Sequence, residues 1–163
     1  MRIEYENKFS DLLLFNAIHQ FLSLALQGLF LILVAYIFWN ELHYYSHGSV
    51  VNAGLTAFFW YLGLWIFQFL FNVIYLFSKK NKSVLTNHII EVQNDAFYEE
   101  TKYNKSFFYW PGIVSAVSRP GFVAVYISGH SAHIVPNRAF ESKAQRTIFL
   151  ALVKEKILAH KES

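Results

Sequence analysis

The chain has 163 residues, of which 55% are hydrophobic and 15% are charged, against about a quarter charged in a typical soluble domain. It contains no cysteine, which excludes disulfide bonds and thiolate metal sites. The formal net charge of +3 comes without runs of Lys and Arg or a recognition motif, so we expect no nucleic-acid partner.

Two long stretches of the chain lack charged residues. No Asp, Glu, Lys or Arg occurs between Asp11 and Glu41, or between Glu41 and Lys79. A helix that crosses the hydrocarbon core of a bilayer needs about 20 apolar residues, because the core is about 30 Å thick and each residue rises about 1.5 Å. Both stretches exceed this length, so the sequence predicts two transmembrane helices.

These helices divide the chain into three predicted parts. In chain order the parts are an N-terminal cytoplasmic segment (1–16), a transmembrane hairpin (17–78, with helices over about 20–39 and 58–77 and an outer loop over 40–57) and a cytoplasmic tail (79–163). Within the N-terminal segment, Ile3 and Tyr5 are expected to form a short strand. This strand would add to a sheet in the tail, since both ends of a hairpin lie on one side of the membrane.

The cations around the hairpin predict its orientation. Lys79, Lys80 and Lys82 follow the second helix directly, and Arg2 and Lys8 precede the first, whereas the connecting stretch has no Lys or Arg. Because basic residues concentrate on the cytoplasmic side of membrane proteins, both termini are expected in the cytoplasm. The three lysines would also meet anionic lipid headgroups, which makes membrane lipids an expected partner.

Three polar residues lie inside the predicted helices. Gln27 is expected about 10 Å deep in the first helix, and Gln68 and Asn72 bracket that depth in the second. An amide hydrogen bond from Gln27 to Gln68 or Asn72 would hold the helices together and contribute about 0.6–2 kcal/mol. The alternative is a pairing between protomers of a homo-oligomer. No ionisable group lies at mid-membrane, which disfavours an ion or proton pathway.

The tail is predicted to contain short strands separated by turns. Strands are expected over 84–92, 96–103, 113–118, 122–127 and 130–135, with an aromatic link over 107–111. Trp110 in this link is the expected anchor of the core. Pro120 and Gly121 predict a tight turn, since Pro presets φ and Gly accepts a positive φ. His130 and His133 are expected at the surface, and Glu99 on a solvated face.

A helix near the end of the tail has the clearest local signature. Ser142 and Gln145 are spaced as in a capping box, in which the two side chains satisfy free amides of the first turn. Apolar residues then recur on one helical face, namely Ile148, Phe149, Leu152, Val153 and Ile157. An antiparallel sheet closed by one helix is an α+β arrangement. The predicted fold class is therefore a membrane α-helical hairpin plus an α+β domain.

A tryptophan, a hydrophobic strand, a hairpin, an Ile-Val-Pro-x-Arg-x-Phe segment and a Ser-initiated helix follow one another in the tail. The residues concerned are Trp110, Ile113, Val117, Ile134, Pro136, Arg138, Ala139, Phe140 and Ser142. This order resembles the YcxB-like family of small bacterial membrane proteins. The resemblance implies a pleckstrin-homology-like (PH-like) domain, a partial barrel capped by the C-terminal helix, after two transmembrane helices. It also implies the bacterial inner membrane as the location, and the family has no settled biochemical activity.

Two groups of residues raise the question of a metal or anion site. His43 and His47 are four apart, a spacing that holds a divalent cation when both lie on one helical face. No third strong ligand accompanies them, so solvated histidines at the membrane interface are the simpler interpretation, and no cofactor is expected. Arg138 would meet an anionic headgroup or a partner carboxylate; the alternative is that it packs along the edge of its own domain.

The sequence predicts a binding protein and no enzyme. No Ser/His/Asp set, paired carboxylate site or Gly-rich phosphate loop is visible in it. We expect the hairpin to hold a PH-like domain at the cytoplasmic face, where an exposed sheet edge or the groove beside the terminal helix binds a protein partner. Three alternatives stay open: an immunity protein that neutralises a secreted interbacterial toxin, a lipid-sensing module, and a component of a small oligomeric channel or transporter.

Overall fold

A computed structural model of the chain describes residues 1–45, 48–77, 84–129 and 131–161. The chain forms two compact units, which are taken separately below. The first comprises Met1–Phe15 and Ser78–Ser163 and is called the sheet unit. The second comprises Asn16–Phe77 and is called the helical unit. The helical unit is therefore inserted into the sequence of the sheet unit.

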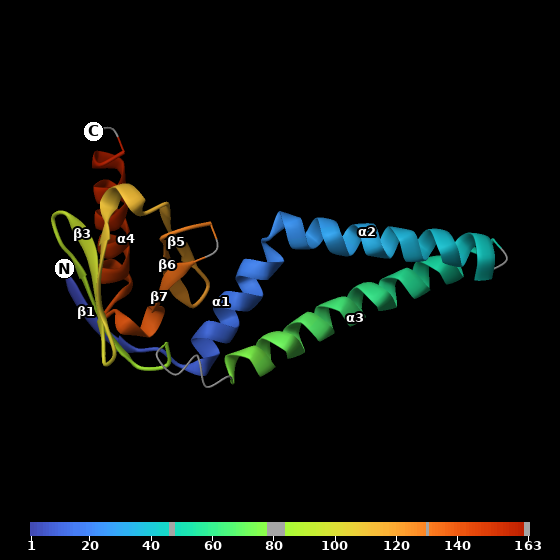
Figure 1. Cartoon of the computed structure of the whole chain (residues 1–163), viewed down its shortest axis with the longest axis horizontal. Coiled ribbons are helices and arrows are strands. Elements are labelled where there is room, and N and C mark those ends of the chain that lie inside the picture. Colours follow the sequence, from blue (N-terminus) through green and yellow to red (C-terminus); the bar gives the residue numbers. More distant parts are fainter. Residues whose placement is uncertain (46–47, 78–83, 130, 162–163) are drawn as a thin grey trace. The chain divides into compact units, whose positions relative to one another are not determined.

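Two long helices form most of the helical unit. Helix α2 (Leu24–Asn40) continues into a π-helical turn (Glu41–Tyr45), and α3 (Val50–Leu76) follows (Figure 1). Each begins at a serine N-cap, where the side-chain oxygen accepts a hydrogen bond from a backbone amide of the first turn. The spans Leu24–Tyr45 and Val50–Leu76 are long and apolar enough to cross a membrane. Helical residues thus extend into the stretch that was expected as outer loop.

A further helix, α1 (Phe9–Phe21), precedes α2 and was not anticipated. Its apolar residues run directly into the first uncharged stretch, so no change of composition marks its end. The helix ends just before Ser23, whose side chain caps α2. The first half of α1 belongs to the sheet unit, where Phe15 makes an edge-on ring contact with Phe122 (centroid distance 5.8 Å).

Among the described residues of the sheet unit, seven strands form two antiparallel sheets. The four-stranded sheet has the order β1-β2-β3-β4 and contains β1 (Arg2–Glu6), β2 (Asn87–Val92), β3 (Ala96–Thr101) and β4 (Lys105–Tyr109). The three-stranded sheet has the order β5-β6-β7 and contains β5 (Ser115–Arg119), β6 (Phe122–Tyr126) and β7 (Ala132–Pro136). The expected N-terminal strand is confirmed, since Ile3 lies opposite Ile90 in the β1–β2 pair. The aromatic link, in contrast, is largely a strand, β4.

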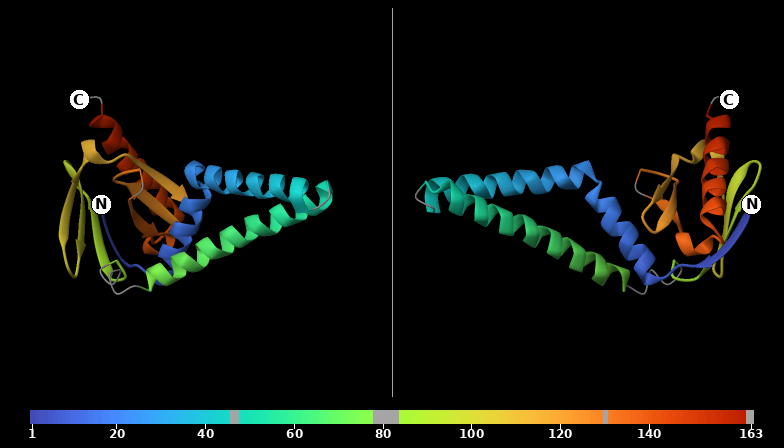
Figure 2. Two further views of the ribbon diagram at one scale, coloured as in Figure 1. Left: turned by 45° about the vertical axis from the view of Figure 1, so that its right-hand side comes forward. Right: turned by 180° about the vertical axis from the view of Figure 1, so that it is seen from behind.

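Helix α4 (Lys143–Ala159) lies in the opening between the two sheets (Figures 1 and 2). Its start is the predicted one, because the Ser142 hydroxyl accepts a hydrogen bond from the Gln145 amide at 3.1 Å. The Gln145 side chain accepts from the Glu141 amide, one residue earlier than a capping box requires. Phe149 and Val153 are fully buried, whereas Ile148, expected on the same face, is 61% exposed.

The buried side chains of both sheets and α4 form one core. Trp110, in a short 3-10 turn (Trp110–Gly112), is fully buried at its centre, as predicted. Its indole N–H donates to the carbonyl oxygens of Gln93 and Asn94 at 3.3 and 3.0 Å. These bonds satisfy the only polar atom of the side chain, so the large ring is buried without an unpaired donor.

Gly121 is a position where an added methyl group should be costly. Its φ is +91°, and a Cβ atom there would lie 2.5 Å from Leu14 Cδ2. Because non-glycine residues are disfavoured at positive φ, we expect Gly121→Ala to lower the free energy of unfolding by about 1–2 kcal/mol. Gly112→Ala is the control, since nothing lies within 4 Å of its added Cβ. Thermal unfolding in mild detergent measures both; equal midpoints would contradict the prediction.

Candidate functional site

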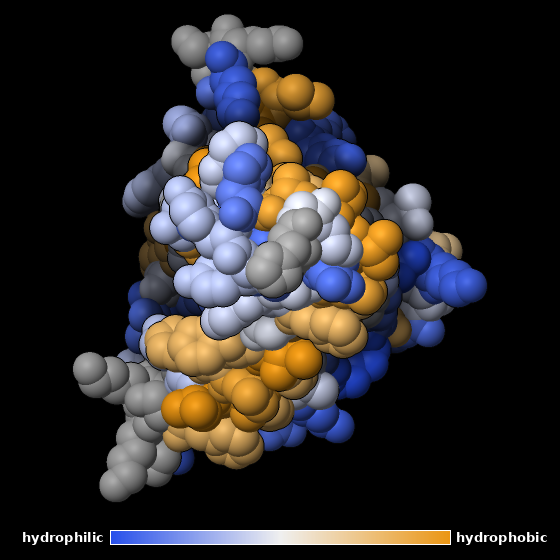
Figure 3. All heavy atoms as spheres, turned by 90° about the vertical axis from the view of Figure 1, so that its right-hand side faces the viewer, coloured by the Kyte–Doolittle hydropathy of each residue, from blue (hydrophilic) through white to orange (hydrophobic). Residues whose placement is uncertain are grey.

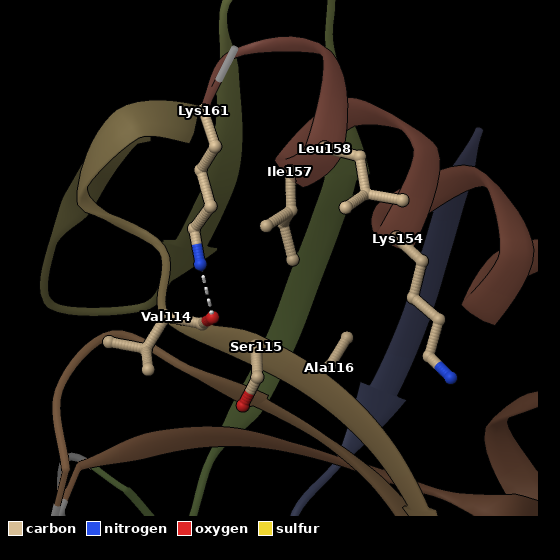
Figure 4. A pocket seen from close by; sticks show the side chains of 7 residues that line it. All are labelled: Val114, Ser115, Ala116, Lys154, Ile157, Leu158 and Lys161. Atoms are coloured by element: carbon tan, nitrogen blue, oxygen red, sulfur yellow. Dashed lines mark hydrogen bonds between the residues drawn. The ribbon is translucent and has the colours of Figure 1, made fainter.

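A groove runs between the outer strand of the three-stranded sheet and the C-terminal half of α4. Strand β5 is at the end of its sheet, so its outer edge has no strand partner among the described residues. The groove has a volume of about 230 Å³. Its lining residues are Val114, Ser115 and Ala116 on the strand side and Lys154, Ile157, Leu158 and Lys161 on the helix side (Figure 4).

The groove is apolar at its centre and basic at its ends. Figure 4 shows the side chains of Ile157 and Leu158 projecting from α4 toward β5. Leu158 is 61% exposed, so it forms an open apolar wall. Lys154 lies in α4, whereas Lys161 lies in the turn that follows the helix, and both line the groove. The Lys161 ammonium donates to the Val114 carbonyl oxygen at 3.0 Å, on the open side of the strand.

Arg138 binds a carboxylate of its own chain. A short 3-10 turn (Asn137–Ala139) after β7 presents its guanidinium, which donates to both oxygens of Asp11 at 2.5 Å and to the Glu6 carbonyl at 2.7 Å. Asp11 also accepts the Lys8 amide in the first turn of α1, at 2.7 Å. Burial alone would raise the pKa of Asp11, but the Arg138 and Lys8 hydrogen bonds and charges hold that pKa below its usual value.

This arrangement decides between the two interpretations of Arg138. Both guanidinium nitrogens that bind Asp11 are engaged within the sheet unit, in the bidentate geometry that Arg favours with carboxylates. Arg138 therefore ties the turn after β7 to the first turn of α1. No local sequence pattern points to Asp11 as the partner of Arg138, because 127 residues separate the two.

A second buried polar cluster joins the two sheets. The Glu99 carboxylate on β3 contacts His88 Nδ1 on β2 at 2.9 Å and His133 Nδ1 on β7 at 3.0 Å. The side chains of Glu99 and His133 are 13% and 12% exposed, so their expected surface positions are wrong. His130 lies outside the described residues. Tyr5 stacks on His88 with its ring centroid 5.5 Å away.

The partners of His88 determine its charge. Its Nδ1 faces Glu99 and its Nε2 faces the Val84 carbonyl at 3.0 Å, and both partners only accept hydrogen bonds. Both contacts are therefore hydrogen bonds only when His88 is doubly protonated. Burial opposes this charge, but the hydrogen bonds to Glu99 and Val84 and the Glu99 charge raise the pKa of His88 overall. Burial likewise opposes the Glu99 charge, yet the two histidines lower the pKa of Glu99 to about 2.

The histidine cluster connects the two sheets through the contacts of Glu99 with His88 and His133. Across the part of the chain that the structure describes, no group of three His, Asp or Glu residues is arranged to hold a metal ion. The three residues of the cluster line part of a pocket of about 260 Å³. His43, one of the two weak ligand candidates, contacts the Trp39 carbonyl through Nδ1 at 2.9 Å and stacks on the Trp39 ring. His47 lies outside the described residues.

The polar residues of the helical unit pair differently from the prediction. Asn72 is buried and exchanges two side-chain hydrogen bonds with Gln20, at 2.9 and 2.5 Å, where Gln27 was the expected partner. Gln27 instead accepts a hydrogen bond from the Tyr61 hydroxyl at 3.3 Å and donates to the Phe21 carbonyl at 3.0 Å. Gln68 is half-buried on α3 and belongs to neither pair.

The remaining predicted residues have structural positions or lie outside the described residues. Pro136 and Phe140 are buried, and Ser142 caps α4. Lys79, Lys80 and Lys82 fall in the stretch 78–83, outside the described residues, so their expected headgroup contacts stay a prediction.

These features define a sheet-and-helix domain that carries an inserted pair of long apolar helices. The family model described as YcxB-like protein matches residues 92–153, and the resemblance to this family is thereby confirmed for that segment. The segment runs from the last residue of β2 into the second half of α4, and it includes Glu99, Trp110 and Arg138. No curated protein and no solved structure matches the chain.

Proposed function

We propose that α2 and α3 anchor the chain in the bacterial cytoplasmic membrane and that the sheet unit is a PH-like module that binds a protein partner at the cytoplasmic face. The open edge of β5 beside the α4 groove is the observation that carries the binding role. An unpaired edge offers backbone donors and acceptors to an incoming segment, and a neighbouring groove provides room for its side chains.

The surface of the helical unit supports the membrane anchor. Few residues of the two apolar spans are buried within the chain. Large side chains such as Ile32, Phe67 and Ile74 are 69%, 68% and 71% exposed. Figure 3 shows extensive hydrophobic areas around the end of the helical unit that faces the viewer. Soluble proteins rarely expose contiguous apolar patches this extensive, whereas lipid chains would cover them at no cost.

The strand order of the sheet unit supports a hairpin topology. Strand β1 precedes the helical unit and β2 follows it, yet the two strands pair along their whole length. Both ends of the helical unit therefore lead into one folded domain, which requires an even number of membrane crossings. The lysines after α3 then favour the cytoplasm for that domain. Four strands, three strands and a C-terminal helix are also the order that a PH-like domain would have.

Three measurements on the full chain in its host test this proposal. Alkaline washing of membrane vesicles should leave the chain in the pellet, and a reporter fused after Ser163 should stay inside the cell. A photo-cross-linking residue in place of Val114, in the groove, should then join the chain to a protein of defined mass. The same residue in place of Tyr109, which is 67% exposed on β4, is the control. Extraction by alkali, an external reporter, or equal cross-linking at both positions would contradict the proposal.

A further inference from the structure

We infer that the β5–α4 groove takes a short extended segment of the partner protein, with an apolar residue at its centre and an acidic residue two positions away on each side. This inference rests on the proposed function and specifies the chemistry of the partner. Strand β5 has five residues, so the segment that pairs with it has about the same length, roughly 17 Å.

The contact between Lys161 and Val114 shows how the edge would accept a strand. An ammonium at the end of a flexible, exposed side chain satisfies the Val114 carbonyl oxygen at 3.0 Å. A backbone N–H of an added strand would take over such an acceptor, as strands do in sheet augmentation. Lys161 would then be released to pair with a carboxylate of the incoming segment. In the absence of a bound segment, Lys161 protects the strand edge against unwanted pairing with other chains, a usual role of lysine beside unpaired strands.

The spacing of the groove residues sets the sequence of the segment. Lys154 lies in α4, and Lys161 lies in the turn that continues from its end, with the Lys161 amide bonded to the Leu158 carbonyl oxygen at 3.1 Å. At a rise of about 1.5 Å per helical residue, the two are about 10 Å apart along the helix axis. Residues i and i+4 of a strand point to the same side and lie about 13 Å apart. The lysine side chains are flexible enough to bridge the difference between these two spacings. The residue between them, i+2, faces the apolar wall formed by Ile157 and Leu158, which explains an acidic–x–apolar–x–acidic order.

Two other occupants fit the groove less well than a peptide segment. A second copy of the chain would bring its own Lys154 and Lys161 to the same edge, and like charges across an interface are repulsive. An anionic lipid headgroup would satisfy the lysines, but it would leave the apolar wall and the backbone of β5 without partners. A peptide segment satisfies all three features of the groove.

Fluorescence polarisation with the full chain in mild detergent tests the inference. The probe is a labelled peptide with the core Glu-Thr-Leu-Thr-Glu, and the comparison peptide carries Lys at both Glu positions. We expect the Glu peptide to bind at least tenfold more tightly than the Lys peptide. The double variant Lys154→Glu, Lys161→Glu should reverse this order. Lys102→Glu, at an exposed position on the loop between β3 and β4, is the matched control and should change neither affinity. Leu158→Ser, at an exposed position, should weaken the Glu peptide without affecting folding.

Three results of the peptide measurements would overturn the inference. They are equal binding of the two peptides, no binding of either, and a preference that survives the charge reversal. Competition by vesicles of anionic lipid, together with indifference to Leu158→Ser, would assign the lysines to the membrane surface and would also overturn it. Cross-linking at Val114 in cells combined with any of these results would leave the proposed function standing and remove only this description of the partner.

Discussion

Replacing Arg138 by Ala is expected to lower the free energy of unfolding of the sheet unit by about 2–3 kcal/mol. The substitution leaves the Asp11 carboxylate, only 11% exposed, with the Lys8 amide as its remaining hydrogen-bond donor. An unpaired charge at a fully buried position costs about 3–5 kcal/mol. The Arg138 side chain is 41% exposed, so water screens part of the interaction and the expected loss is smaller.

A double-mutant cycle separates the charge from the contact. Asp11→Asn removes the charge that Arg138 neutralises, so Arg138→Ala should cost less in that background than in the native chain. Thermal unfolding in mild detergent gives the stabilities, and hydrogen exchange of residues 8–12 reports the first turn of α1. Lys102→Ala, at an exposed position on a loop, serves as the control. A loss below about 0.5 kcal/mol for Arg138→Ala would show that the pair is only a surface contact.

Replacing Glu99 by Gln is expected to destabilise the sheet unit by about 2–3 kcal/mol near pH 6 and to change how its stability depends on pH. The variant removes the charge that supports the imidazolium of His88 across the β2–β3 pair. It also weakens the hydrogen bond to His133, which joins the two sheets. Both histidines lose their common charged partner in one substitution.

The pH range of this effect follows from the two pKa shifts. The pKa of Glu99 falls from 4.5 to about 2 on folding, so its contribution is present above pH 4.5 and is lost as the pH falls toward 2. The pKa of His88 is raised above 6.5 on folding, so its contribution is present below pH 6.5 and is lost as the pH rises through the raised value. Stability from this pair is therefore greatest between pH 4.5 and 6.5.

Unfolding midpoints measured from pH 4 to 9 test this expectation. The native chain should lose stability on the alkaline side of the maximum, and Glu99→Gln should flatten that slope. Glu91→Gln is a suitable control because Glu91 is a half-buried residue of β2 outside the cluster. Parallel pH profiles for the native chain and Glu99→Gln would show that His88 is not charged in the folded protein.

The sequence predicts those parts of the fold that depend on local patterns. The length of the two uncharged stretches indicates the two apolar helices. The Pro120-Gly121 pair indicates the β5–β6 turn, and Ser142 marks the start of α4. Helix α1 was not predicted as a separate helix because most of its residues lie in the same uncharged, apolar stretch as α2. Strand β4 was missed because a run of aromatic residues has no alternation with polar ones.

The buried polar groups depend on contacts between distant residues, so they could not be predicted in the same way. His88, Glu99 and His133 lie on three strands, and only the fold brings them together. One signal was present: Phe97 and Glu99 are two residues apart on one strand and so point to the same face. Since Phe97 is fully buried, Glu99 also points inward.

The pairing of β1 with β2 determines when the domain can fold during synthesis of the chain. The first strand leaves the ribosome before the apolar helices, whereas its neighbour in the sheet leaves after them. The domain therefore cannot close until the eighty residues between the two strands have been made, a delay that leaves Ile3 and Tyr5 exposed in the meantime. A fragment that starts after the helices would also lack this strand and the Asp11 partner of Arg138, so an isolated tail is an incomplete domain.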